Sequence, residues 1–150
     1  MPGLSGRFTM KVSPDVAGKL LSDPERLSSC LPGVSGCERQ NERVVCRVRL
    51  DTAGIDSGYL TKLSGKMSIE GPLQGDAIGY RIQGRVAGAS LNLSLSLQVS
   101  PSAEGSEVSW TAEIDFGLLG RMLGQERLLE VTEANVDKVI RCIGERLTSP

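Results

Sequence analysis

Alternation of apolar and polar residues dominates the chain as far as residue 116. Residues 4–12 predict a first strand, and the span 34–116 predicts six more. One-sided alternation over several consecutive strands indicates an antiparallel sheet with one face in solvent. The clearest strand has an apolar face that needs a core to cover it, formed by Leu91, Leu93, Leu95, Leu97 and Val99. Turn-forming residues are expected to separate the strands at 40–41, 51–58, 71–76, 88–89 and 101–106.

Two short helices are predicted between the first strand and the rest of the sheet. The pairs Ser13-Pro14 and Asp23-Pro24 each place an N-cap residue before a proline at the first helical position. The second helix is expected to run to Leu31, because Pro32-Gly33 stops it there.

After Gly117 the period of apolar residues changes from two to that of a helix. If this helix is continuous from Leu118, it is about 45 Å long at 1.5 Å per residue, and it is the only element able to cover the sheet. We therefore predict an α+β fold over residues 1–150 as a single domain. A curved seven-stranded antiparallel sheet surrounds a long C-terminal helix, and two short helices follow the first strand.

A cavity is expected between the sheet and the long helix, because one helix touches a curved sheet along a line. Inward glycines at Gly6, Gly65 and Gly84 favour unfilled volume, although strand glycines also mark bends and bulges. Residues 117–124 combine three glycines with four large apolar residues and are interpreted as a flexible apolar gate. A frayed helix start would explain them equally well. The predicted ligand-binding residues are Tyr59, Leu63, Met67, Tyr80, Leu95, Trp110, Ile114, Leu118, Leu119, Met122 and Leu123.

Composition excludes several functions. With 17 basic and 18 acidic residues and few aromatic ones, the chain lacks the charge and the stacking surfaces of a nucleic-acid binder. Histidine is absent, which excludes Ser-His-Asp and Cys-His catalysis.

The four cysteines form no CxxC pair, so we interpret them as free, mostly buried thiols in a reducing compartment. No apolar run is long enough to span a membrane and the start lacks the layout of a signal peptide, so the expected location is cytoplasmic.

The segment DPERLSSCLPG, residues 23–33, resembles the signature of the family named after the G subunit of carbon monoxide dehydrogenase. The FTMKV first strand and the passage from Trp110 to Gly117-Leu118-Leu119-Gly120 extend the resemblance over most of the chain. This family belongs to the START-like, helix-grip superfamily. The resemblance implies a seven-stranded sheet that grips a C-terminal helix. It also implies an accessory role beside molybdenum-containing carbon monoxide dehydrogenases, in handling an apolar molecule such as a quinone or in membrane attachment.

Within this signature Asp23 and Glu25 are explained as a helix cap and a first turn, so neither is assigned a catalytic role. Cys30 is interpreted as a small buried apolar residue rather than a reactive thiol. Trp110 is either a plug in a packed core or a wall of the cavity.

We predict a non-enzymatic binder or carrier of a quinone- or lipid-like molecule, without a cofactor, in a pocket of ~300–1,000 Å³. Inward-facing acids and bases are almost absent, and only Tyr59 and Tyr80 offer polar groups for a cyclase- or hydratase-like enzyme. A third hypothesis is a docking or maturation factor that binds a dehydrogenase complex through the apolar gate. The expected partners are an apolar small molecule and that complex, with no nucleic acid and at most transient membrane contact.

Overall fold

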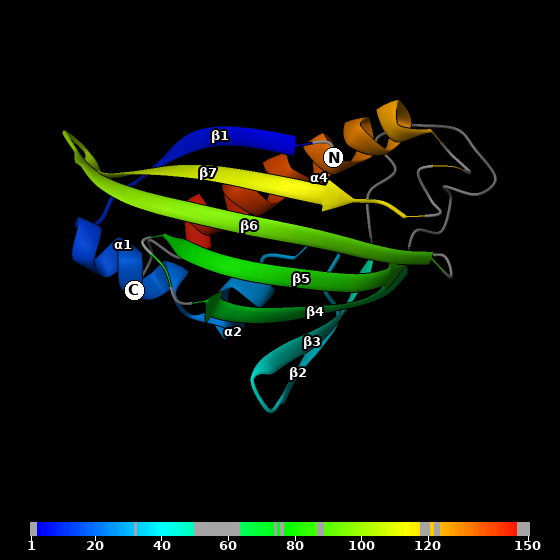
Figure 1. The fold of residues 1–150 in the computed structure, drawn as a ribbon. Coiled ribbons are helices and arrows are strands. Elements are labelled where there is room, and N and C mark those ends of the chain that lie inside the picture. Colours follow the sequence, from blue (N-terminus) through cyan, green and yellow to red (C-terminus); the bar gives the residue numbers. More distant parts are fainter. Residues whose placement is uncertain are drawn as a thin grey trace.

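Seven strands form one antiparallel sheet that curves around a C-terminal helix, as predicted (Figure 1). The computed structural model describes residues 3–31, 33–49, 64–73, 75, 77–86, 89–117, 121 and 124–146. The strands are β1 Gly3–Met10, β2 Gly36–Gln40, β3 Arg43–Arg49, β4 Ser64–Leu73, β5 Ile78–Val86, β6 Ala89–Ser102 and β7 Gly105–Asp115. Their order in the sheet is β1-β7-β6-β5-β4-β3-β2.

The hairpin between β6 and β7 is longer than expected. The sequence predicts a turn over residues 101–106, but Pro101 pairs with Ser106 and Ser102 with Gly105, so the ladder continues almost to the tip. Gly105 makes this tight reversal practicable, because its φ of +138° is a conformation that L side chains rarely adopt. A Cβ there would also lie 2.7 Å from the carbonyl oxygen of Met10.

The two short helices are α1 Pro14–Leu21 and α2 Pro24–Ser28. Both predicted caps are confirmed. The Ser13 hydroxyl accepts a hydrogen bond from the Val16 amide at 3.3 Å, and the Asp23 carboxylate accepts one from the Glu25 amide at 3.0 Å.

The second short helix ends earlier than predicted. Helix α2 stops at Ser28 rather than at Leu31, and the chain continues in tighter turns. The amide of Cys30 donates to the Leu27 carbonyl at 3.0 Å, and the amide of Leu31 donates to the Ser28 carbonyl at 3.1 Å. These bonds reach back three residues instead of four, which is the 3₁₀ pattern common at helix ends.

The C-terminal helix, α4 Gln125–Arg146, starts seven residues later than the continuous helix considered from Leu118. Gly124 precedes it with a φ of +86°, outside the helical range, while its carbonyl accepts the Leu128 amide at 3.3 Å. The helix is therefore about 33 Å long. The proposed gate residues Leu118, Leu119, Met122 and Leu123 lie outside the described residues.

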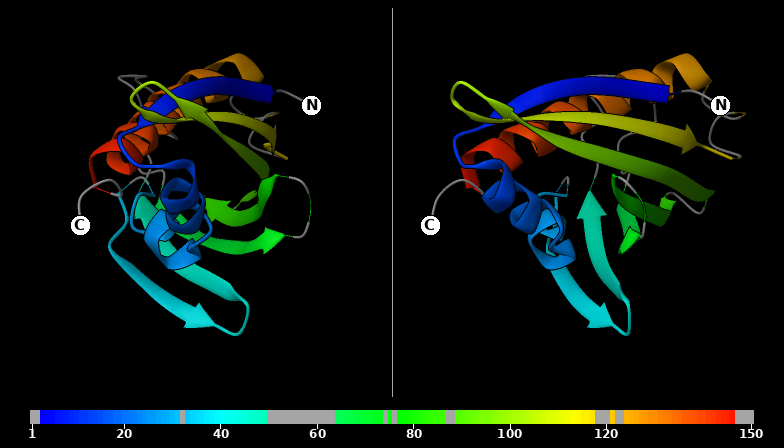
Figure 2. Two further views of the ribbon diagram at one scale, coloured as in Figure 1. Left: turned by 90° about the vertical axis from the view of Figure 1, so that its left-hand side faces the viewer. Right: turned by 60° about the vertical axis from the view of Figure 1, so that its left-hand side comes forward.

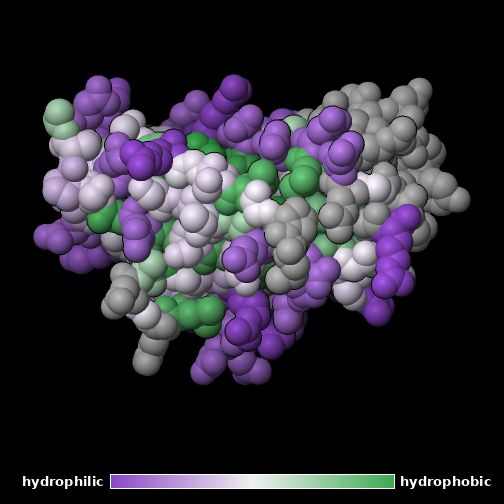
Figure 3. Space-filling view, turned by 45° about the horizontal axis from the view of Figure 1, so that its top comes forward, coloured by the Kyte–Doolittle hydropathy of each residue, from purple (hydrophilic) through white to green (hydrophobic). Residues whose placement is uncertain are grey.

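Helix α4 runs along the concave side of the sheet, and α1 and α2 lie near the end where α4 finishes (Figure 2). Helix α1 contacts β6 and β7, whereas α2 contacts β3 and β4. Polar side chains dominate the face in Figure 3, with smaller hydrophobic areas between them. No helix within the described ranges is long and apolar enough to cross a bilayer.

Candidate functional site

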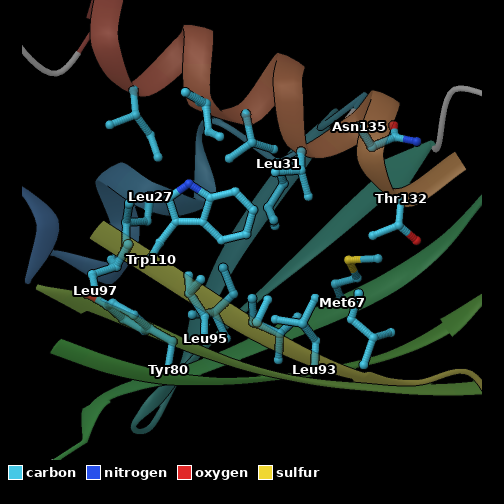
Figure 4. A pocket seen from close by; sticks show the side chains of 18 of the residues that line it. Leu27, Leu31, Met67, Tyr80, Leu93, Leu95, Leu97, Trp110, Thr132 and Asn135 are labelled. Carbon is cyan, nitrogen blue, oxygen red and sulfur yellow. The ribbon is translucent and has the colours of Figure 1, made fainter. Parts of the chain in front are cut away.

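An apolar cavity of about 170 Å³ lies between the concave face of the sheet and α4 (Figure 4). The sheet supplies most of its wall, through inward residues that alternate with solvent-facing ones. Helix α4 supplies the opposite wall, and α2 with the following turn supplies Leu27 and Leu31. The remaining lining residues are Phe8, Met67, Ile69, Tyr80, Ile82, Leu91, Leu93, Leu95, Leu97, Trp110, Ala112, Ile114, Phe116, Thr132, Asn135, Val136, Val139, Ile140 and Ile143.

The cavity is smaller than the ~300–1,000 Å³ expected for a small-molecule site. Two glycines that are expected from the sequence to leave volume unfilled instead make room for large neighbours. A Cβ at Gly6 would lie 2.9 Å from Trp110 Nε1, and one at Gly84 would lie 3.0 Å from Met67 Cγ. The indole and the thioether side chain therefore occupy the space beside these glycines.

Trp110 is a wall of the cavity and only 8% exposed. Figure 4 shows its indole between the strands and α4, with the ring nitrogen on the edge turned toward the helix. The Nε1 hydrogen has no acceptor among the described residues. A buried donor without a partner costs about 1–3 kcal/mol. Because Nε1 lies against Gly6 and is itself covered, an acceptor in the cavity reaches it only if a neighbouring side chain moves.

Tyr80 lines the same cavity from β5, but its hydroxyl is already engaged. It donates to the Leu21 carbonyl at 2.6 Å, which ties β5 to the end of α1. Burial raises the pKa of Tyr80 above its ordinary value, and the negative charge of Asp23 raises it further.

The structure brings five of the predicted residues together around the cavity: Met67, Tyr80, Leu95, Trp110 and Ile114. Tyr59, Leu63, Leu118, Leu119, Met122 and Leu123 lie outside the described residues. Sequence reasoning missed Leu91, Leu93 and Leu97 as site residues although they share the inward face of Leu95, and the alternation in β6 could have identified them. That these side chains contact a ligand remains a prediction.

Two polar residues of α4, Thr132 and Asn135, were also missed. The Thr132 hydroxyl donates to the Leu128 carbonyl at 2.7 Å, and Asn135 is only 5% exposed. Figure 4 shows both near one end of the cavity, on the helix side. Among the described lining residues none carries a carboxylate, an ammonium or a guanidinium group. The cavity is therefore suited to apolar contact with a few hydrogen bonds.

The interpretation of the cysteines as free thiols is wrong. Cys30 is bonded to Cys142 and Cys37 to Cys46, with Cα–Cα distances of 5.5 and 4.1 Å. Cys30 is buried, as predicted, but as half of a disulfide. The Cys30–Cys142 bond joins the turn after α2 to α4, next to the lining residues Leu31 and Ile143.

The curved sheet, the paired short helices and the helix across the concave face together define a START-like, helix-grip fold. A conserved protein from Geobacillus kaustophilus is similar, with a TM-score of 0.76, 17% identity, and 97% of this chain and 93% of that chain covered. The Zhui aromatase/cyclase from Streptomyces sp. R1128 follows with a TM-score of 0.62, 14% identity and coverage of 97% and 93%. A START superfamily protein from Mycobacterium smegmatis has a TM-score of 0.57, 11% identity and coverage of 97% and 96%.

The sequence pattern of the CoxG family, described as the G subunit of carbon monoxide dehydrogenase, matches residues 6–148. The chain belongs to this family, as the DPERLSSCLPG segment predicts. No protein with a curated description matches it in sequence. Because all three identities are low, these structural likenesses show the fold alone.

Proposed function

We propose that this protein binds and carries an apolar small molecule that bears an oxygen acceptor, such as a quinone or a lipid carbonyl. The observation that carries the proposal is the pairing of an apolar wall with one buried donor, Trp110 Nε1, that lacks an acceptor within the described part of the chain. Apolar burial supplies affinity at about 25 cal/mol per Å², and the indole N–H selects for an oxygen.

The size of the cavity sets which part of the ligand is enclosed. Its volume of about 170 Å³ is close to the roughly 150 Å³ of an engineered protein cavity that holds benzene. One substituted ring or a short chain segment fits this space. A longer molecule would keep its tail outside or widen the cavity by moving α4 away from the sheet.

Binding is favoured over catalysis by the chemistry of the wall. The Tyr80 hydroxyl donates to a backbone carbonyl and holds its proton more firmly than an ordinary tyrosine, and the charged side chains of a general acid or base are missing from the described lining. An aromatase/cyclase occurs among proteins of this fold. Turnover of a polyketide or hydroxylated ring by the purified protein would contradict the non-enzymatic proposal.

The partner that we propose for delivery is an enzyme of the carbon monoxide dehydrogenase type, on the strength of the family description. The alternative role, docking or maturation of such an enzyme, needs the same complex but no ligand. A variant that cannot bind ligand yet still supports the enzyme would favour the alternative.

The predicted cytoplasmic location rests partly on free thiols, and it loses that support because disulfides are commonest in oxidising compartments. Rapid alkylation of intact cells, followed by fractionation, would settle the location and the cysteine state together. Blocked thiols in the cytoplasmic fraction would restore the prediction.

The test compares duroquinone with durene, which share a tetramethylated ring and differ in two carbonyl groups. Equilibrium dialysis measures both affinities for the wild type and for Trp110→Phe, which keeps an aromatic ring but removes the N–H. The wild type is expected to prefer duroquinone about two- to tenfold, since one hydrogen bond contributes roughly 0.5–1.5 kcal/mol. Trp110→Phe should lose this preference, because it has no donor for the quinone oxygen.

Phe8→Leu is the matched control, because it trims another aromatic ring of the wall and leaves the indole N–H in place. Phe8→Leu should lower the affinity for both ligands by a similar factor, and the preference for duroquinone should remain. If neither ligand binds the wild type, and native mass spectrometry finds no co-purified apolar molecule, the carrier function is wrong.

A further inference from the structure

The solvent-facing side of the sheet carries rows of residues that stand directly opposite one another on β3, β4 and β5. One row consists of Arg47, Lys66 and Arg85, and it continues to Ser90 on β6. All three cations are exposed, and none is in an ion pair with another described residue. Like charges placed directly opposite in a sheet destabilise it, so this row has a structural cost.

The parallel row four residues away on each strand provides a contrast. There Arg43, Glu70 and Arg81 stand opposite one another, and the central glutamate forms an ion pair with Arg43 at 3.8 Å. The same three strands thus balance charge in one row and leave it unbalanced in the other. Glu70 lies between two arginines in its row, as Lys66 does in the other. A glutamate is therefore compatible with this position in the sheet, and packing alone does not require a lysine at position 66.

A shallow hollow of about 690 Å³, widely open to solvent, lies over the Lys66 and Arg85 part of this row, and Arg47 stands beside it as the next residue of the row. Its lining includes the two cations Lys66 and Arg85 together with the hydrogen-bonding side chains Ser68, Gln83, Ser90 and Asn92. This outer hollow is separate in chemistry from the apolar cavity, although Met67 and Leu91 belong to the lining of both.

We propose that the Arg47–Lys66–Arg85 row and its hollow bind a phosphate group. A phosphate carries about −1.5 to −2 charge and three acceptor oxygens, so a single group can offset two of the three cations. A carboxylate carries one charge and two oxygens and would leave more of the row unbalanced. Arginine and lysine both donate strongly to phosphate oxygens, and the nearby hydroxyl and amide groups add further donors.

The phosphate could belong to a soluble compound or to a lipid headgroup, and two arms of one experiment separate these sources. In the first, inorganic phosphate and pyrophosphate are titrated at constant ionic strength while amide NMR shifts of Lys66, Arg85 and Ser90 are followed. In the second, the protein is sedimented with vesicles of phosphatidylcholine, with and without phosphatidylglycerol. Binding that is lost when the row is mutated supports the site. Binding in the first arm identifies a soluble phosphate compound as the source, and binding in the second identifies a lipid headgroup.

Lys66→Glu is the decisive variant, because it converts the row into the pattern of its neighbour. Affinity should fall more than tenfold, while the variant should melt no lower than the wild type. Arg7→Glu on β1 is the matched control, since it makes the same change in net charge at an exposed outer position. It should leave affinity within twofold.

Three results would overturn the proposal. The first is the absence of binding in both arms, and the second is an equal loss in Arg7→Glu, which would indicate diffuse charge attraction. The third is polyglutamate binding as tight as that of pyrophosphate, which would indicate an acidic protein as the partner. None of these outcomes depends on the apolar cavity, so the carrier function is tested separately.

Discussion

The indole of Trp110 lies beside Gly6, its direct partner on the neighbouring strand, where a Cβ would stand only 2.9 Å from Nε1 and Cζ2. This close approach sets the position of the largest side chain in the cavity wall. The ring is rigid and only 8% exposed, so a Cβ at Gly6 would have to push it toward the cavity or move the two strands apart.

We therefore expect Gly6→Ala to lower the free energy of unfolding by about 1–3 kcal/mol, the usual cost of overpacking. Urea unfolding measures this change. Gly36→Ala is the control, since nothing lies within 4 Å of a Cβ there, and it should be close to neutral. Equal stability of Gly6→Ala and the wild type would show that the indole has room to shift.

Tyr80→Phe should lower the free energy of unfolding by about 1–3 kcal/mol at neutral pH, because it leaves the buried Leu21 carbonyl without its 2.6 Å hydrogen bond. The wild type should also lose stability in alkali. The folded protein holds the Tyr80 proton more tightly than the unfolded chain, whose tyrosine pKa is about 10. This contribution is complete below pH ~10 and is lost as the pH rises further.

Urea unfolding at a series of pH values between about 8 and 11 checks the alkaline effect. The difference between wild type and Tyr80→Phe should shrink as the pH rises. Phe8→Leu, which removes apolar contact without a titrating group, should differ from the wild type by a constant amount. A constant difference for Tyr80→Phe as well would contradict the raised pKa.

The two disulfides should contribute unequally to stability. Cys30 and Cys142 are separated by 112 residues, whereas Cys37 and Cys46 are separated by nine. In the chain-entropy account, closing a loop of about 100 residues stabilises by about 4.7 kcal/mol, and a loop of about 10 residues by roughly 3 kcal/mol or less.

Double alanine variants of each pair, unfolded in urea under non-reducing conditions, measure the two contributions. The Cys30/Cys142 variant should lose roughly 2 kcal/mol more than the Cys37/Cys46 variant. Reductant should change the stability of the wild type and leave a protein without either pair unaffected. Equal losses from the two pairs would contradict a mainly entropic origin.

Much of the fold could be predicted because its signals are local. Period-two alternation along residues 91–99 marks the inward face of β6, and the Ser13 and Asp23 caps depend on amides only two or three residues away. The start of α4 could not be placed in the same way. The apolar stripe extends across residues 118–123, while the helix begins only after Gly124 adopts a positive φ.

The same distinction between local signals and tertiary packing applies to the candidate site. Alternation by itself determined that Leu95, Trp110 and Ile114 face inward, and the absence of histidine determined that the familiar histidine-based catalysis is excluded. Only the tertiary structure decided which distant residues meet. Trp110 lies beside Gly6, the Tyr80 hydroxyl is hydrogen-bonded to the Leu21 carbonyl, and Cys30 is bonded to Cys142. The physical reason is that the direction of a side chain follows from its own strand or helix, whereas its neighbours depend on register and packing between elements far apart in the chain.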